Sequence, residues 1–285
     1  MKNKFILFLS CVALFTSCSD EDATNASEKK KVTGTIEVET DDVFASADYE
    51  FVLPRPFALA ANFQEAGMKY DASRTNPTEN VSNYNSKGAQ LINFGVYSTD
   101  LVYNIMNEKP QQTMKYFLTI KDLAEKFGMG SIFTEDDLAL EIEKNIADRE
   151  MMEELLIEVH ERSQEYLDDN DMRYLAAIQF AGAWIEGMYL VSFDLTEQDV
   201  NVVGPKLIDQ MTLLKNTIHA LEVYPHRDDA INQVLEALKT LQDNYNNFGS
   251  VVATGGKGMP KLTGEEIAQV AQEIQEIRKM VVELK

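Results

Sequence analysis

The chain has 285 residues, of which 47 are Asp or Glu and 26 are Lys or Arg, so its formal net charge is −21. This negative charge opposes binding to DNA or RNA, which relies on basic side chains that neutralise phosphates. An apolar fraction of 45% suffices for a hydrophobic core, and the length fits one large domain or two small ones. We expect a folded protein that does not bind nucleic acid.

The first 17 residues have the three parts of a secretory signal peptide: a basic head, an apolar run and small residues before Cys18. The apolar run is too short to span a bilayer as a helix, which needs about 20 residues. The segment L-F-T-S-C at 14–18 resembles the lipobox of bacterial lipoproteins. That resemblance implies cleavage before Cys18 and acyl chains on this residue. An ordinary signal peptide followed by an incidental cysteine is the alternative.

Cysteine usage supports acylation of Cys18. Cys11 and Cys18 are the two cysteines of the sequence, and Cys11 lies in the segment that would be removed. Exported proteins usually pair their cysteines or leave none spare. Each buried methylene contributes about 0.8 kcal/mol, so several acyl chains on one residue would hold stably. We therefore expect a protein anchored to the outer membrane through Cys18, without a spanning helix.

Residues 18–48 are predicted to form an acidic, mostly disordered tether between the anchor and the folded domain. The segment S-D-E-D at 19–22 resembles the acidic tag of surface lipoproteins of the Bacteroidetes, in which the tag favours display on the cell surface. A solvated tether explains the same residues, so the leaflet stays open. The predicted organisation is a lipoprotein signal peptide at 1–17, this tether, and a helical domain at 49–285.

The apolar residues after Tyr49 recur with helical spacing. The short connections between periodic runs favour antiparallel neighbours. We expect an all-α fold of about nine helices, arranged as an irregular multi-helix bundle or a short stack of helical hairpins. The predicted helices cover 56–70, 81–108, 111–127, 135–147, 149–168, 171–194, 201–223, 228–247 and 264–284, the last of them after a Gly-rich linker.

Several residues fit helix ends. Thr263 with Glu266, and Thr134 with Asp137, have the spacing of N-caps with an acid three residues on. Further signals come from Gly128 and Gly130, which suit a left-handed C-cap, and from an acid-rich turn that predicts Asn170 or Asp171 as an N-cap.

Two predicted helices differ in character. The helix at 149–168 carries Glu residues along one face and apolar residues along the other, as a surface helix does. The helix at 171–194 is apolar nearly all round and contains small residues that allow close approach, so we interpret it as the central buried helix. A membrane span is the alternative, but Glu186 in its middle would cost about 2.5–3.5 kcal/mol there.

The candidate buried site consists of Glu186 and Trp184 in this apolar helix. Burial raises the pKa of a carboxyl group unless the group is paired or hydrogen-bonded. Glu186 therefore either belongs to a functional site or is satisfied by Lys, Arg or Tyr from a neighbouring helix, and the second interpretation is favoured.

His219 and Glu222 have H-x-x-E spacing, which places both side chains on one helix face. Metal sites in helical bundles normally need a second carboxylate–histidine pair. The imelysin-like periplasmic proteins of iron uptake carry G-x-H-x-x-E, but Thr217 occupies the Gly position here. These two residues are weak metal candidates, and a surface pair is the favoured interpretation. We predict no metal, no cofactor and no catalytic residues.

The chain from Cys18 onward resembles a group of helical lipoproteins of the Bacteroidetes that have no assigned activity. The resemblance rests on N-P-T-E-N at 76–80, G-V-Y-S-T-D-L-V-Y at 95–103 and F-A-G-A-W-I-E-G-M-Y at 180–189, and it implies no catalytic residues. The leading hypothesis is a non-enzymatic, lipid-anchored binding module of the cell envelope with an envelope protein as partner. The alternative is a helical protein of nutrient uptake that binds a small molecule or a metal.

Overall fold

The computed structural model describes residues 70–285 apart from 134–137, 196–198 and 225, and these belong to one compact unit, Ser46–Lys285. Every regular element in the described residues is a helix, which confirms the all-α prediction. The predicted signal peptide, Cys18, the tether and residues 56–69 of the predicted helix at 56–70 lie outside the described residues, and Tyr70 belongs to no regular element. The α-helices are α2 (Lys87–Met106), α3 (Pro110–Lys126), α4 (Leu138–Asn145), α5 (Arg149–Asp169), α6 (Tyr174–Ser192), α7 (Val200–Val223), α8 (Asp229–Asn246), α9 (Gly249–Val252) and α10 (Gly264–Val282), and the short 3-10 helices are η1 (Ala72–Arg74), η2 (Thr78–Asn83) and η3 (Gly130–Phe133).

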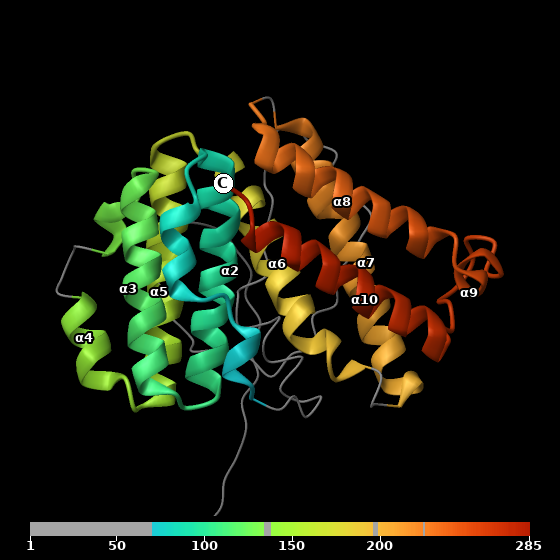
Figure 1. The fold of residues 1–285 in the computed structure, drawn as a ribbon, viewed down its shortest axis with the longest axis horizontal. Helices are drawn as coiled ribbons and strands as arrows, with labels where there is room; N and C mark the ends of the chain where they lie inside the picture. Colours follow the sequence, from blue (N-terminus) through green and yellow to red (C-terminus); the bar gives the residue numbers. More distant parts are fainter. Residues whose placement is uncertain (1–69, 134–137, 196–198, 225) are drawn as a thin grey trace, which may run out of the picture. The chain divides into compact units, whose positions relative to one another are not determined.

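The helices α2 and α6 form the centre of the domain (Figure 1). Sixteen of the 20 residues of α2 and 16 of the 19 residues of α6 are buried. The other helices cover this pair: α3 packs on α2, α10 packs on α6, and α7 and α8 pack on each other and on α10. The core therefore surrounds two helices that are far apart in the sequence.

The prediction of a central buried helix at 171–194 is confirmed by α6. Among the described residues, α6 is the one helix long and apolar enough to cross a membrane, but 89% of its apolar window is buried inside the domain. Such burial is expected for the core helix of a globular domain, whose apolar surface is covered by neighbouring helices.

The backbones of α2 and α6 are in direct contact at two glycines. A Cβ atom at Gly95 of α2 would lie 1.9 Å from the carbonyl oxygen of Gln179, and one at Gly182 of α6 would lie 1.8 Å from the carbonyl oxygen of Ile92. The Thr99 hydroxyl donates a hydrogen bond of 3.1 Å to the carbonyl oxygen of Ala183 on the other helix. No residue larger than glycine fits at either of these two positions without separating the helices.

Some of the predicted helix caps are present in the structure. Thr263 and Glu266 form a complete capping box at the start of α10, as predicted. Gly128 follows α3 with φ of 94°, which confirms it as a left-handed C-cap, whereas Gly130 has no positive φ and begins η3. The other predicted N-cap, Thr134 with Asp137, lies outside the described residues.

Two predicted helix starts are wrong. The Ser86 side chain caps α2 by accepting from the Ala89 N–H, so α2 begins at Lys87, and η2 occupies part of the segment predicted as its first turn. Asn170 is the C-cap of α5, and Asp171 has φ of 54° in the turn that follows it, so neither residue is the N-cap of α6. Both errors arise because short polar side chains stabilise turns and helix starts equally well.

The surface helix α5 has the predicted amphipathic character. Its acidic face is exposed at Glu150, Glu154, Glu161 and Glu165. Only three of its 21 residues are buried: Met152, Leu155 and Leu167. The helix therefore covers the core and contributes only these three buried side chains to it.

Alanine substitutions at two glycines of α6, Gly182 and Gly187, should have opposite effects on the stability of the domain. We expect Gly182→Ala to destabilise the domain by at least about 1–3 kcal/mol, the usual cost of overpacking, because the new methyl meets backbone and not a flexible side chain. Gly187→Ala on the same helix meets its nearest atom at 4.0 Å and should stabilise by about 0.5–1 kcal/mol through helix propensity. Urea unfolding monitored by circular dichroism measures both, and equal effects would contradict the contact.

Candidate functional site

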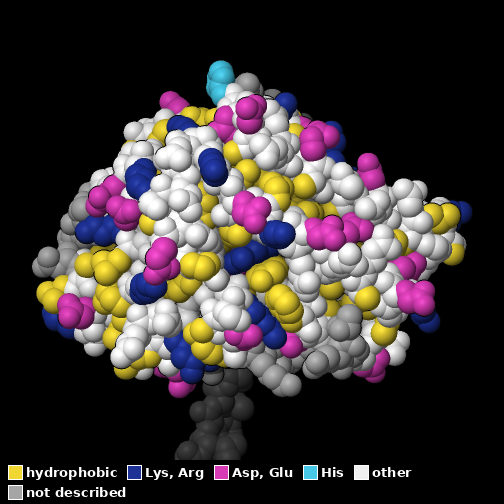
Figure 2. All heavy atoms as spheres, in the orientation of Figure 1, with side chains coloured by type: hydrophobic (Ala, Val, Ile, Leu, Met, Phe, Trp, Pro, Cys, Tyr) yellow, Lys and Arg dark blue, Asp and Glu magenta, His cyan; other side chains and the backbone are white. Residues whose placement is uncertain are grey.

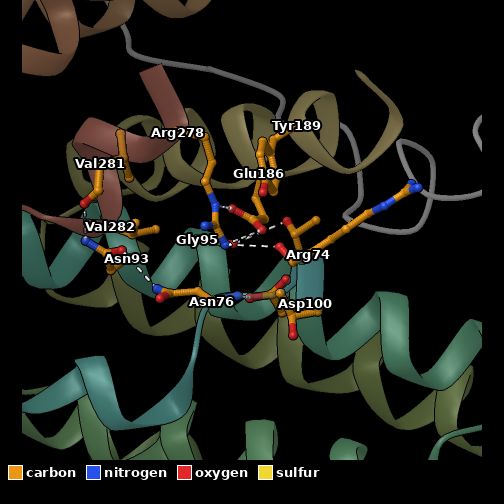
Figure 3. Close-up of polar contacts among 12 residues, drawn as sticks. Arg74, Asn76, Asn93, Gly95, Asp100, Glu186, Tyr189, Arg278, Val281 and Val282 are labelled. Atoms are coloured by element: carbon orange, nitrogen blue, oxygen red, sulfur yellow. Dashed lines mark hydrogen bonds and ion pairs between the residues drawn. The ribbon is translucent and has the colours of Figure 1, made fainter. Parts of the chain in front are cut away.

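Glu186 forms a buried, two-point ion pair with Arg278 (Figure 3). The carboxylate comes from α6 and is fully buried, and the guanidinium comes from α10 and is 9% exposed. Arg278 Nε donates to Glu186 Oε2 over 2.8 Å, and Nη2 donates to Oε1 over 3.1 Å. Glu186 is thus buried as the apolar run predicts, and the favoured interpretation of a satisfied core residue is correct.

A second acid, Asp100 of α2, is buried beside this pair. Its Oδ2 atom accepts a hydrogen bond of 2.9 Å from the Asn76 backbone N–H, whereas its Oδ1 atom is buried without a partner. The Asp100 and Glu186 carboxyl groups are within hydrogen-bonding reach of each other, and burial, followed by the charge of Glu186, holds the pKa of Asp100 well above its usual range. The raised pKa favours the protonated form of Asp100, and the neutral acid can donate a hydrogen bond to Glu186. The two acids and one guanidinium together are then electrically neutral.

Arg278 also binds the chain that precedes α2. Its Nη2 atom donates to the carbonyl oxygen of Arg74 over 3.2 Å, and its guanidinium carbon lies 4.4 Å from the centre of the Tyr189 ring. Burial lowers the pKa of Arg278, but the charge of Glu186 and the hydrogen bonds to it outweigh burial, so the net shift is upward. The guanidinium thus stays charged and connects η1, α6 and α10.

Buried amides and tyrosines extend this network toward the start of α2. The Asn93 amide donates to the carbonyl oxygen of Val281 over 3.1 Å, and the Asn76 amide donates to the Tyr84 hydroxyl over 2.9 Å. The Tyr116 hydroxyl donates to the carbonyl oxygen of Asn76 over 2.9 Å. Burial raises the pKa of Tyr84 and Tyr116, so both hydroxyls remain protonated donors at neutral pH. We call Asp100, Glu186, Arg278 and Asn76 the buried polar cluster.

The other predicted site residues do not join this cluster. Trp184 is buried and its Nε1 atom donates to Gln210 of α7 over 3.1 Å, so Trp184 and Glu186 face different helices and do not form one site. His219 is exposed, and Glu222 pairs with Lys239 over 3.1 Å. No group of three metal-ligating side chains occurs within the described parts of the chain. Cys18 lies outside them.

A cavity of about 120 Å³ lies between α5 and the helices α2, α3 and α6. Four phenylalanines and several aliphatic side chains line it, together with polar side chains that include His160, Ser163 and Gln164 of α5. None of the four residues of the buried polar cluster lines this cavity. The cavity and the cluster are thus separate features.

Sequence reasoning did not single out Asp100, Arg278, Asn76 or the cavity. A signal for Arg278 is present, because Ala271, Ile274 and Val281 define the buried stripe of α10 and position 278 falls on it. Asp100 lies inside a long run of buried residues in α2, which is the only local indication of its burial.

Comparisons with protein-family models, with curated proteins and with solved structures give no significant match to this chain. The functional argument therefore rests on the sequence and on the geometry described above.

Replacement of Arg278 should lower the free energy of unfolding of the domain. Arg278→Met removes the cation and leaves Glu186 buried without compensation, a change that typically costs about 3–5 kcal/mol. The control is Arg173→Met, which breaks an ion pair with Asp168 whose arginine side chain is 52% exposed and should cost less than about 1 kcal/mol. Chemical denaturation gives both values, and similar losses would contradict a buried role for Arg278.

The proton assigned to Asp100 predicts a pH effect. The unfolded chain loses this proton near pH 4, whereas the folded state keeps it to higher pH because the pKa is raised. The stabilising contribution of this group is therefore complete below about pH 4 and declines as the pH rises toward the folded pKa. Asp100→Asn keeps a donor toward Glu186 without a titrating proton, so its stability relative to wild type should increase from pH 4 to pH 8.

Urea titrations across this pH range compare wild type, Asp100→Asn and, as a control for the loss of one exposed acid, Asp209→Asn. A difference between wild type and Asp100→Asn that does not change with pH would contradict the protonated state of Asp100.

Proposed function

We propose that this protein is a non-enzymatic, lipid-anchored binding protein of the cell envelope, with another envelope protein as its partner. The observation that carries the proposal is the signal-like segment that ends at Cys18: a basic head, an apolar run and the lipobox-like L-F-T-S-C. This arrangement is typical of a secreted chain that is cut before a cysteine and held on the membrane by acyl chains.

The state of the buried acids supports a non-enzymatic role. Catalytic carboxyl groups must reach a substrate in a cleft. Glu186 is fully buried and both of its oxygens bind Arg278. Asp100 is also fully buried and binds the backbone of Asn76. Contacts within the domain therefore occupy these groups, as expected for residues that hold helices together.

The charge of the chain supports an acyl anchor over electrostatic adsorption. Loss of residues 1–17 would remove two lysines and no acid, which makes the formal charge −23. Such a chain is repelled by an anionic lipid surface. Figure 2 shows acidic, basic and apolar side chains interspersed over one face of the domain. We propose that the protein is anchored in the outer membrane. The acidic segment 19–22 is compatible with either leaflet, and anchoring in the outer leaflet would display the domain on the cell surface.

The cavity between α5 and α2 favours a second candidate function, the binding of a small molecule. Ligand sites in helical bundles lie between helices and are mostly apolar with a few polar groups, and this cavity has that composition. Metal binding at His219 and Glu222 has less support, because Glu222 pairs with Lys239 on a neighbouring helix.

The anchor is tested by Cys18→Ser in the full chain. Wild type should incorporate radiolabelled palmitate and sediment with the outer membrane, and the variant should do neither, because serine offers no sulfur for the acyl chain. The matched control is Cys11→Ser, which lies inside the predicted signal peptide and should leave labelling unchanged. Unchanged membrane association of Cys18→Ser would contradict the proposal.

The partner is tested by cross-linking in intact cells that express wild type or Cys18→Ser. The proposal expects the same envelope protein to be captured repeatedly by wild type, with much less capture by the unanchored variant. Wild type that is labelled with palmitate yet captures no envelope protein would contradict the binding role while leaving the anchor intact.

A further inference from the structure

We propose that the cavity between α5 and the helices α2, α3 and α6 binds a small, neutral, ring-shaped molecule that carries one hydrogen-bonding group. This inference deepens the small-molecule alternative given above and does not depend on the lipid anchor. The volume of the cavity, the residues that line it and the position of α5 each support this proposal.

The position of α5 leaves the cavity unfilled. The six lining residues that α5 contributes, from Leu156 to Gln164, are all half-buried, whereas most lining residues of α2, α3 and α6 are buried. Apolar side chains of α5 such as Leu156, Ile157 and Val159 therefore face the cavity without complete packing around them. Mostly apolar spaces between the helices of a bundle are common ligand sites, so the cavity at this position can take an occupant.

The volume sets the size of that occupant. The cavity has a volume of about 120 Å³, and an apolar cavity of about 150 Å³ in another protein holds one benzene molecule. A single ring therefore matches the space, and a long acyl chain does not. Acyl chains on Cys18 are thus unsuitable occupants by size.

Aromatic side chains of the lining favour a ring. Phe94, Phe117, Phe133 and Phe180 all line the cavity. Three of them already make edge-to-face contacts with phenylalanines: Phe94 with Phe127 at 5.3 Å, and Phe117 with Phe133 at 6.0 Å between ring centres. Aromatic rings prefer such edge-to-face or offset arrangements, which a ligand ring can extend.

The polar residues of the lining define the other end of the ligand. Ser163 and Gln164 of α5 offer a hydroxyl and an amide, and His160 of the same helix also lines the cavity. Among the described residues that line the cavity there is no Asp, Glu, Lys or Arg. A charged ligand would lose its hydration without gaining an opposite charge, which is costly, so a neutral ligand with one donor or acceptor fits best.

The full chain with Cys18→Ser, purified without detergent so that no acyl chain competes, is titrated with phenol and with benzene. Methyl-labelled Ile, Leu and Val side chains report binding by NMR. We expect saturable shifts at cavity methyls such as Val102, Ile120 and Val159. Phenol should bind about fivefold more tightly than benzene, the effect of one additional hydrogen bond.

Two variants fill the cavity from opposite walls: Ser163→Phe on α5 and Ser98→Leu on α2. Each should abolish the saturable shifts while the methyl spectrum remains that of a folded protein. Glu161→Phe places the same ring on the exposed face of α5 and should leave phenol binding unchanged. If one filling variant fails to fold, the other provides the comparison.

The absence of saturable shifts in the wild-type cavity, or their persistence in a folded filling variant, would overturn the proposal. Equal affinity for phenol and benzene would overturn the assigned ligand class. These results are independent of acylation, so they separate failure of the cavity proposal from failure of the lipid anchor.

Discussion

The backbones of α2 and α6 touch at Gly95 and Gly182, and this contact determines which side chains meet next to it. The two helices run in the same direction through the contact, since Ile92 lies by Gly182 and Thr99 lies by Gly187. Asp100 and Glu186 lie about one helical turn beyond the two contact glycines. Close packing of the backbones therefore brings two acids together in the core, and neither acid can withdraw to solvent.

The buried polar cluster follows from that constraint. Two carboxyl groups in a dry core need compensation, and Arg278 together with one proton provides it. A buried ion pair of this kind adds little net stability compared with apolar packing, because both charges lose their hydration. Its strict hydrogen-bond geometry can instead select one arrangement of helices. Here it requires α10 to pack on α6 in the register that brings Arg278 to Glu186.

The sequence predicted most helices because apolar spacing and caps are local signals, as the capping box at Thr263 illustrates. It also predicted the burial of Glu186, since that acid lies in a run with no polar face. It could not supply the partner, because Arg278 lies 92 residues away and arginine on a helix usually extends to solvent. Segments 76–80, 95–103 and 180–189, whose resemblance to helical lipoproteins was noted, each contribute one member of the buried polar cluster. The cavity depends on how far α5 stands from the core, which no local pattern specifies.

The shallow seating of α5 has a consequence for exchange between the cavity and water. A helix that buries three of its 21 residues separates from the domain at a lower free-energy cost than α2 or α6, whose displacement would break the glycine contact. The half-buried side chains of α5 leave the cavity partly open to solvent, so a ligand can reach it while α2 and α6 keep their contact; local separation of α5 would only widen that opening.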